Sequence, residues 1–424
     1  MKIGIIIGRI GGVDGVALET EKWIQVFQRM GHEVFILSGQ FEERELDPSH
    51  ETLYPVLSFF STECEWEQNG AFFDPVKDPT QLLEDIEKVS ENISNRIQSW
   101  VQEKGIEVLL SENASALPSH LSMALGIWKA VESSGLPTLT HDHDFHWERG
   151  DRYISPHSGI NELIEKYFPL DLPNVKHAVI NLHAQSRLKE RHNIDSIVVP
   201  NVMDFDVPYG LKTNENKNLL KDLGFTNGVI PLFQVTRIVE RKGIEVAIEL
   251  MHRLEDRNAK LVITGNHNDD EGGKYYRMLI NQIHDLKLND QVIFASNLIQ
   301  NHSWQGHQGS VKYSLSDAYA HANACTYFST YEGFGNAFVE AVLAKTPVFV
   351  NNYKPVYMPD IGSKGFKTVM LEDNELTDEA VEQMKDIIYK PELNKEIGEY
   401  NFELGKKHFS YGVLKEKLEE LLNA

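Results

Sequence analysis

The chain has 424 residues, more than one hydrophobic core of ordinary size accommodates, so two domains of about 200 residues are expected. Its 41% apolar and 25% charged residues are typical of a soluble globular protein, and no apolar run reaches the ~18–20 residues that cross a bilayer. The net charge of −22 disfavours nucleic acids and anionic lipid surfaces as partners, and the two cysteines, Cys64 and Cys325, offer no disulfide framework, which indicates a cytoplasmic protein.

The first half of the chain alternates short apolar strands with amphipathic helices. It opens with KIGIIIG at 2–8, which runs into a Gly-rich turn and is therefore expected to be a strand and not a secretion signal. Further strands are predicted at 33–38, 106–111, 136–141, 175–182 and 195–200, and helices at 15–30, 80–103 and 118–133. A stretch rich in Pro and acidic residues extends to about residue 79. The alternation is typical of a parallel sheet covered on both faces.

Residues 201–228 are rich in Asn, Gly and Asp and are expected to form a linker with a short helix. The pattern then restarts, with strands predicted at 229–236, 259–265, 291–296, 323–329 and 346–352, helices at 243–255, 274–286 and 313–321 and from Asn336, and a helical tail from about 377. The fold class is therefore α/β, with two Rossmann-like domains and a ligand cleft at the carboxyl ends of their strands.

The stretch STYEGFGNAFVEAV at 329–342 combines two carboxylates with a glycine-rich helix start. Because it follows a strand, the backbone amides near Gly333 and Gly335 are expected to face an oxygen-rich ligand. Glu332 would face the same ligand, and Glu340, one turn into the helix, would accept hydrogen bonds from a vicinal diol. The alternative is an ordinary strand-loop-helix unit with solvated glutamates.

Two cations, Arg237 and Lys242, lie in the stretch VTRIVERKG, which also follows a strand and opens a helix. Such a pair suits a diphosphate, and it can stabilise the charge of a leaving phosphate without a metal ion. The alternative is that both are surface cations on a turn.

With these motifs the chain resembles the retaining GT-B glycosyltransferases known as "glycosyl transferases group 1", or family 4. Glu332 and Glu340 match the E-x7-E motif of that family, and Arg237 and Lys242 match its Arg and Lys pair. The Gly-rich N-terminal turn and the domain-junction signature of the family match Gly11 and Gly12, and the stretch VPNVMD. The resemblance extends over essentially the whole chain, but these motifs do not define the donor or the acceptor.

The resemblance implies an acceptor-binding Rossmann-like domain at 1–204, a nucleotide-sugar-binding domain at 205–408, and a crossover helix at 409–424 that packs on the first domain across a central cleft. Glu340 would hold the ribose hydroxyls of the donor, and Arg237 and Lys242 its diphosphate. Its sugar hydroxyls would meet Glu332 and the amides of Gly333, Phe334, Gly335 and Asn336. Transfer would proceed with retention, without a metal or other cofactor, and Gly11 and Gly12 would let the backbone approach the donor phosphate or the acceptor.

The His-rich stretch THDHDFHWERGDRY at 140–153 follows the predicted strand 136–141. The resemblance places His141 near the donor sugar and the reacting centre. Asp142, His143 and Asp144 are interpreted as contacts to acceptor or donor hydroxyls, and Arg149 and Arg152 as contacts to a carboxylate or phosphate of the acceptor. A metal site built from His141, His143 and His146 with the aspartates is the competing interpretation. A polar loop that is rich in histidine by chance is the other.

The sequence thus predicts a metal-independent hexosyltransferase that uses UDP-glucose or GDP-mannose and a soluble, anionic small-molecule or saccharide acceptor. Three alternatives stay open: a lipid-linked or surface-polysaccharide acceptor, a nucleotide-sugar epimerase or phosphorylase of the same fold, and a nucleotide-sugar-binding protein without turnover. NAD is disfavoured, because the turn from Gly8 to Gly15 lacks Gly-x-Gly-x-x-Gly. The nucleotide base is expected near 264–267 and 295–300, and the oligomeric state stays open.

Overall fold

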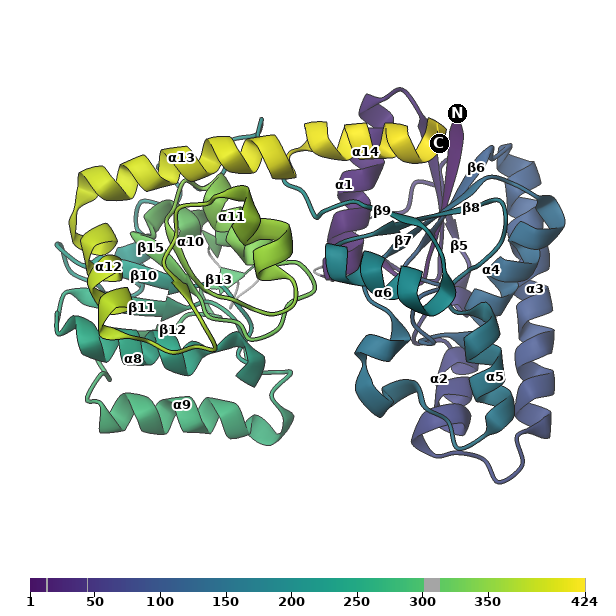
Figure 1. Ribbon diagram of the computed structural model, residues 1–424, viewed down its shortest axis with the longest axis horizontal. Coiled ribbons are helices and arrows are strands. Elements are labelled where there is room, and N and C mark those ends of the chain that lie inside the picture. The colour runs from purple at the N-terminus through teal and green to yellow at the C-terminus, as the bar shows by residue number, and fades with distance from the viewer. Residues whose placement is uncertain (13, 44, 301–312, 424) are drawn as a thin grey trace. The chain divides into compact units, whose positions relative to one another are not determined.

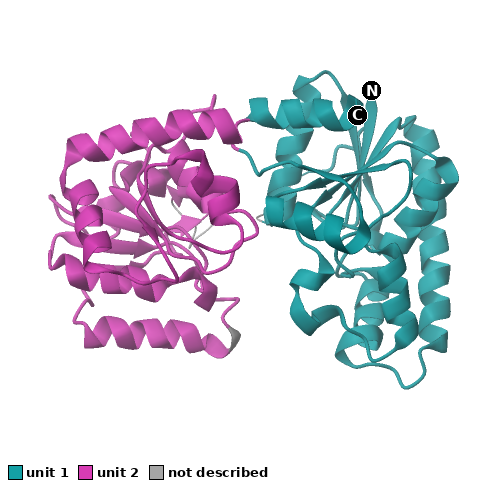
Figure 2. Cartoon of the chain, viewed as in Figure 1, with its two compact units in different colours: residues 1–202, 411–424 teal, residues 203–410 magenta. Residues whose placement is uncertain are grey.

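The computed structural model describes residues 1–12, 14–43, 45–300 and 313–423. The chain divides into two compact units (Figure 2): unit 1 comprises Met1–Val202 and Tyr411–Ala424, and unit 2 comprises Met203–Ser410. The chain passes between the units at Val202–Met203, inside the VPNVMD stretch, and again at Ser410–Tyr411. The sequence placed these two points at residues 204 and 408.

Unit 1 is built on a seven-stranded parallel sheet in the order β5-β3-β1-β6-β7-β8-β9 (Figure 1). Its strands are β1 Lys2–Ile7, β3 Glu33–Ser38, β5 Glu51–Leu53, β6 Val108–Glu112, β7 Thr138–Asp142, β8 Val175–Val179 and β9 Ser196–Val198. A separate short pair joins β2 Ile10–Gly11 to β4 Phe41–Glu42. The helices are α1 Gly15–Arg29, α2 Thr62–Gln68, α3 Thr80–Lys104, α4 Leu121–Ser134, α5 Ser158–Tyr167, α6 Leu182–His192 and α14 Tyr411–Asn423.

Side-chain alternation along the buried strands divides the helices of unit 1 between the two faces of the sheet. Ile3 and Ile5 of β1 pack in one core with α1 and with Leu414 of α14. Ile6 points the other way, into a core with α3 and α4 that includes Trp100. The final helix α14 thus contributes to the core of unit 1, and Lys176 Nζ fixes its end by donating to the Leu421 carbonyl at 2.9 Å.

Unit 2 repeats the design with a six-stranded parallel sheet in the order β12-β11-β10-β15-β16-β17. Its strands are β10 Ile230–Gln234, β11 Ala259–Ile263, β12 Val292–Phe294, β15 Ala324–Tyr327, β16 Val348–Asn351 and β17 Met370–Leu371, and the short β13 Ile299–Gln300 pairs with β14 Tyr313–Ser314. The helices are α7 Leu219–Asp222, α8 Ile244–Leu254, α9 Lys274–Asp285, α10 Leu315–His321, α11 Asn336–Leu343, α12 Asp378–Tyr389 and α13 Pro391–Phe409. The predicted α/β class with two Rossmann-like units is confirmed.

The stretch up to residue 79 contains β5 and α2, which the sequence did not predict. Helix α2 begins at a capping serine, since the Ser61 side chain accepts from the Cys64 amide. Along the described residues, no helix combines the length and the apolar character that crossing a membrane requires.

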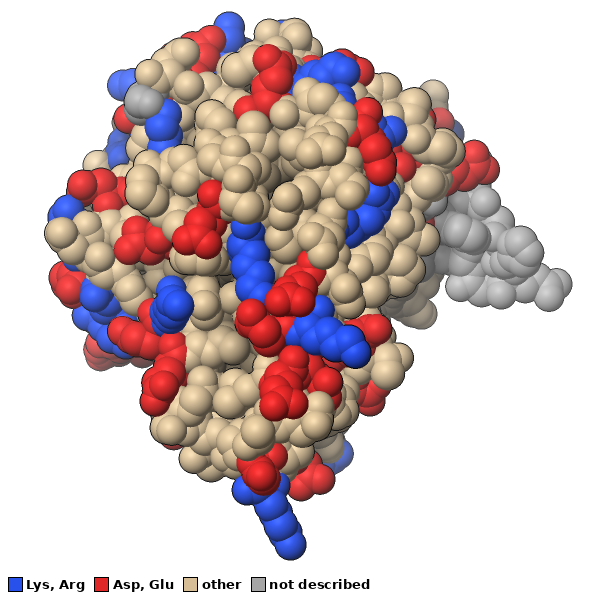
Figure 3. Space-filling view, turned by 90° about the vertical axis from the view of Figure 1, so that its right-hand side faces the viewer, with Lys and Arg blue, Asp and Glu red and all other residues tan. Residues whose placement is uncertain are grey.

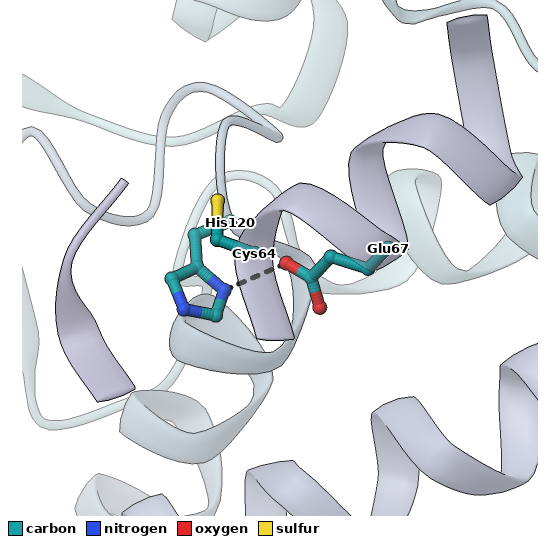
Figure 4. A group of neighbouring side chains, drawn as sticks. All are labelled: Cys64, Glu67 and His120. Carbon is teal, nitrogen blue, oxygen red and sulfur yellow. Dashed lines mark hydrogen bonds and ion pairs between the residues drawn. The ribbon is translucent and has the colours of Figure 1, made fainter. Parts of the chain in front are cut away.

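A buried ion pair ties α2 to the loop after β6 (Figure 4). His120 Nδ1 donates to Glu67 Oε1 at 2.6 Å, and its Nε2 donates to the Val56 carbonyl at 2.8 Å. Both ring nitrogens face groups that only accept, so His120 is an imidazolium. Burial opposes this charge, but the Glu67 carboxylate outweighs burial and the pKa of His120 is raised. Glu67 also accepts from the amide and hydroxyl of Ser122, which leaves a fully hydrogen-bonded buried pair.

We expect Glu67→Gln to lower the free energy of unfolding by about 3–5 kcal/mol, because it leaves the buried imidazolium without its counter-charge. Urea denaturation of the full chain measures the change. The matched control is Glu65→Gln on the same helix, where the side chain is exposed and the change should stay within about 0.5 kcal/mol. Equal losses in the two variants would contradict the role of the pair.

Candidate active site

The carboxyl edge of the sheet in unit 2 carries the Glu332 loop, between β15 and α11. Gly335 has φ +127°, and a Cβ at this position would lie 2.1 Å from the Tyr353 hydroxyl oxygen. That hydroxyl donates to the Phe334 carbonyl at 2.9 Å, so the loop closes tightly over Tyr353. Only glycine fits here, which explains the second glycine of the motif on conformational grounds.

Glu332 lies between two cations of the loop that follows β10. Its Oε1 pairs with Lys242 Nζ, and its Oε2 is 3.1 Å from Arg241 Nη1, which also donates to the Tyr331 carbonyl at 2.9 Å. Burial would raise the pKa of Glu332, but the charges of Lys242 and Arg241 outweigh burial and lower it. Burial lowers the pKa of Lys242, in spite of Glu332. The predicted Lys242 thus meets the predicted Glu332, and Arg241 joins them.

Arg237 belongs to the same loop but points to a different partner. Its guanidinium pairs with Asp269, and both side chains are more than half exposed. It is still close enough for its charge to lower the pKa of Lys242. Arg237 and Lys242 therefore lie in one electrostatic environment, each held by a carboxylate that an anionic ligand would have to displace.

Gln234, at the end of β10, fixes the backbone that carries Lys242. Its buried side chain donates to the Lys242 carbonyl at 3.0 Å and accepts from Thr326 Oγ1 of β15 at 2.5 Å. The sequence analysis missed this residue. A polar amide at the end of an otherwise apolar strand was the available signal, because a buried amide needs hydrogen-bond partners.

Glu340 lies at the second turn of α11 and is half-buried. The hydroxyl of Tyr319, from α10, donates to Glu340 Oε2 at 3.0 Å. Burial first, and then the Glu340 charge, raise the pKa of Tyr319, so this hydroxyl stays protonated and remains a donor. Tyr319 thus orients the carboxylate.

The remaining residues of unit 2 that were predicted to contact the nucleotide sugar lie around the start of α11. Gly333 and Asn336 are half-buried at the loop and at the first position of α11. The Phe334 ring is buried and packs edge-on against Phe409, with ring centroids 5.5 Å apart. The Phe334 side chain is therefore part of the core, and only its backbone can meet a ligand.

In unit 1, His141 and Glu112 lie opposite each other at the ends of β7 and β6. His141 Nδ1 is 2.9 Å from Glu112 Oε1, and His143 Nε2 is 3.1 Å from the same oxygen. The His141 ring stacks on Trp23 of α1, with centroids 4.1 Å apart. The sequence did not single out Glu112, because its partners become visible only when the two strands are placed in register.

Burial dominates the electrostatics of this cluster. It lowers the pKa of His141 to about 4 and also lowers that of His143, and it raises the pKa of Glu112 to about 7. At neutral pH the two histidines are uncharged, so each ring can donate one hydrogen bond to a hydroxyl and accept another from a hydroxyl.

The other predicted residues of the His-rich stretch lie in different places and contact different partners. Asp142 is buried and accepts from Thr140 Oγ1 at 2.7 Å. Asp144 pairs with Arg149, which is half exposed. Arg152 donates from Nη2 to Gln68 Oε1 at 3.2 Å. Asp142 is thus part of the sheet interior, and the two arginines occupy different environments.

Three further residues named in the sequence analysis, Gly11, Gly12 and His146, are surrounded by other parts of unit 1. A Cβ on Gly11, at φ +89°, would lie 2.1 Å from the Glu42 carbonyl oxygen, and one on Gly12, at φ +64°, would lie 2.5 Å from Glu42 Oε2. The two glycines therefore permit the close approach of β4 to β2. His146 is not among the ligand groups around His141 and borders Trp147, with ring centroids 4.8 Å apart.

Two side-chain groups among the described residues have the spacing of metal ligands. Glu112, His141 and His143 offer one ligand atom each within 4.8 Å of one another, and so do Cys64, Glu67 and His120. In the second group both histidine nitrogens are already hydrogen-bonded, and burial raises the pKa of the Cys64 thiol to about 12. The first group is the one that could accept a metal ion.

Solved structures of similar fold support the two-unit architecture. A glycosyltransferase from Rickettsia africae has a TM-score of 0.66 and 15% identity, covering 99% of this chain and 98% of the other. Sucrose-phosphate synthase from Thermosynechococcus elongatus has a TM-score of 0.65 and 14% identity, covering 100% and 98%. Anabaena HepE in complex with UDP-glucose has a TM-score of 0.64 and 14% identity, covering 100% of both chains.

Sequence comparison identifies relatives over the full length. Mannosylglucosylglycerate synthase of Thermotoga maritima is 32% identical, with 100% of this chain and 99% of the relative covered. The enzyme of the same name from Petrotoga mobilis is 28% identical, with 96% and 98% covered. The family model described as "Glycosyl transferases group 1" matches residues 216–404, which include the Arg237 loop and both motif glutamates. The chain belongs to the group 1 glycosyltransferases, enzymes of the GT-B fold.

Proposed function

We propose that this protein is a retaining glycosyltransferase that moves a hexose from a nucleotide sugar to a soluble, anionic acceptor. The observation that carries the proposal is the arrangement of Lys242, Arg237 and Glu340 on the carboxyl edge of unit 2. Two cations and a tyrosine-oriented carboxylate are suited to a diphosphate and a ribose. The nucleotide sugar is a substrate, so no cofactor is required.

The relatives' name favours one donor and one acceptor. A mannosylglucosylglycerate synthase, by its name, makes a mannosylated glucosylglycerate, which supports GDP-mannose ahead of UDP-glucose. The corresponding acceptor is glucosylglycerate. Its carboxylate agrees with the anionic acceptor expected from the two arginines.

In the proposed reaction the bond between the anomeric carbon and the diphosphate oxygen breaks as the acceptor oxygen approaches on the same face of the sugar. The proton of the acceptor hydroxyl passes to the leaving phosphate oxygen, and Lys242 and Arg237 stabilise the negative charge that develops there. His141 is uncharged at neutral pH, so it serves as a hydrogen-bond partner of a sugar hydroxyl. Positive charge from the two side chains takes the place of a metal ion.

The test of this function is a transfer assay with GDP-mannose or UDP-glucose and glucosylglycerate, followed by NMR of the product. We expect one new α-linked sugar from the α-linked donor, formed at the same rate with and without EDTA. A β-linked product would contradict retention. Loss of activity with EDTA, restored by a divalent metal, would instead assign a metal to Glu112, His141 and His143.

Glu340→Gln should weaken nucleotide binding by about 10- to 100-fold, because a charge-assisted hydrogen bond to the ribose diol contributes about 1.5–3 kcal/mol. Isothermal titration calorimetry with GDP and UDP measures the effect. Glu392→Gln, at an exposed position of α13, is the control and should bind like the wild type. Wild-type affinity in E340Q would remove the ribose role.

Lys242→Met should lower turnover by about 10²–10³-fold, the range for loss of one group that stabilises developing charge. The transfer assay measures turnover at saturating donor, and Lys385→Met on α12 controls for loss of a surface charge. A circular dichroism melt of each variant separates lost catalysis from lost folding. Near-normal turnover in a folded K242M would end the diphosphate assignment.

A further inference from the structure

We infer that Arg152, and not Arg149, binds the carboxylate of the acceptor in a preformed site on unit 1. The inference rests on the proposed function, since it assigns the anionic group of the proposed acceptor to one side chain. From the sequence, both arginines were interpreted as contacts to a carboxylate or phosphate of the acceptor, and the structure distinguishes between them.

The Arg152 guanidinium lies in an aromatic setting with one hydrogen bond. It lies 4.1 Å from the ring centroid of Phe73 and 4.6 Å from that of Tyr153, and its Nη2 donates to Gln68 Oε1. Its Nη1 is buried and has no hydrogen-bond partner in the described part of the chain. A buried guanidinium nitrogen without an acceptor is costly, and a bound carboxylate would satisfy it.

The charge of Arg152 is also uncompensated. Within the described residues no carboxylate lies within ion-pair distance of it, whereas Arg149 pairs with Asp144, and Arg9, Arg96, Arg187 and Arg253 each have an acidic partner. With a net charge of −22, this chain has acidic side chains in excess. A half-buried arginine that lacks one is therefore available to an anion from outside the chain.

The surroundings of Arg152 are fixed before any ligand arrives. Gln68, which holds the guanidinium, is itself buried and donates to the Pro118 carbonyl at 2.8 Å. The Tyr153 hydroxyl is 3.0 Å from Ser119 Oγ, next to His120 of the buried ion pair with Glu67. A guanidinium with preset orientation loses little conformational entropy when it binds a planar carboxylate.

The same surroundings leave the site reachable. The Phe73 side chain that covers the guanidinium is 62% exposed, so the cover of the site lies at the surface and not in the core. Arg152 follows β7, the strand that carries His141, and Gln68 ends α2, which follows β5, so both segments leave the unit 1 sheet at the carboxyl ends of their strands. On the face of the molecule drawn in Figure 3, basic and acidic side chains are mixed and form no broad basic surface.

The experiment compares two acceptors that differ only in the charged group. Glucosylglycerate carries a carboxylate where glucosylglycerol carries a neutral hydroxymethyl group. Isothermal titration calorimetry on the full-length protein, without donor, measures the binding of each. The wild type should bind glucosylglycerate about 10- to 100-fold more tightly. Arg152→Gln should lose this preference and leave glucosylglycerol binding unchanged.

Arg149→Gln is the matched control and should keep the preference, because Asp144 already neutralises Arg149. If R152Q does not fold, Arg152→Lys answers the same question, since an ammonium group cannot hold Gln68 and a carboxylate in one plane and should lose most of the preference. A wild type that binds the two compounds equally, or binds neither, overturns the assignment, as does an R152Q or R152K protein that keeps the preference. Transfer to glucosylglycerate in the assay above would leave the proposed function intact.

Discussion

A buried carboxylate stays ionised when nearby positive charge or hydrogen-bond donors replace the water it has lost, and Glu332 in unit 2 depends on the positive charge of two side chains. Its side chain is 11% exposed and lies between Lys242 and Arg241, both from the loop after β10. The ion pairs join the loop after β10 to the loop after β15, and these two strands are neighbours in the sheet. Because a buried charge costs several kcal/mol without its partner, the two loops hold each other in place.

This arrangement has a consequence for ligand binding. Lys242 and Arg237 are both engaged by carboxylates in the structure, so a diphosphate gains their charge only by competing with Glu332 and Asp269. A Glu332 that loses Lys242 keeps Arg241 and gains any hydroxyl donor that the ligand brings. Lys242 would exchange the Glu332 carboxylate for a ligand anion, and this exchange costs less free energy than leaving a buried charge without any partner. The ion pair is therefore a suitable resting state for a site that receives anions.

The sequence was sufficient for features that depend on local pattern. The apolar strands and the helices that alternate with them follow from period and length, and the glutamates, glycines and cations of unit 2 follow from their position after strands. It was not sufficient for features that depend on register and side-chain direction. Glu112 joins His141 only through the pairing of β6 with β7, and Asp142 turns toward Thr140 because neighbouring residues of a strand face opposite sides. Arg152 likewise meets Gln68 from a segment far away in the sequence, and α2, which carries Gln68, lies in a stretch without a clear apolar period.

The two units reach polar recognition by opposite electrostatic routes. In unit 2, Lys242 and Arg237 are each paired with a carboxylate, and under the proposed function they bind a diphosphate. Unit 1 keeps His141 and His143 neutral by burial, which lowers the pKa of His141 to about 4, so these side chains suit uncharged sugar hydroxyls. Arg152 departs from this rule in unit 1, since this half-buried cationic side chain has no carboxylate partner in the part of the chain that the structure describes. An acceptor made of a sugar joined to a carboxylic acid needs both kinds of contact, and unit 1 provides two neutral histidines and an arginine that has no carboxylate partner among the described residues.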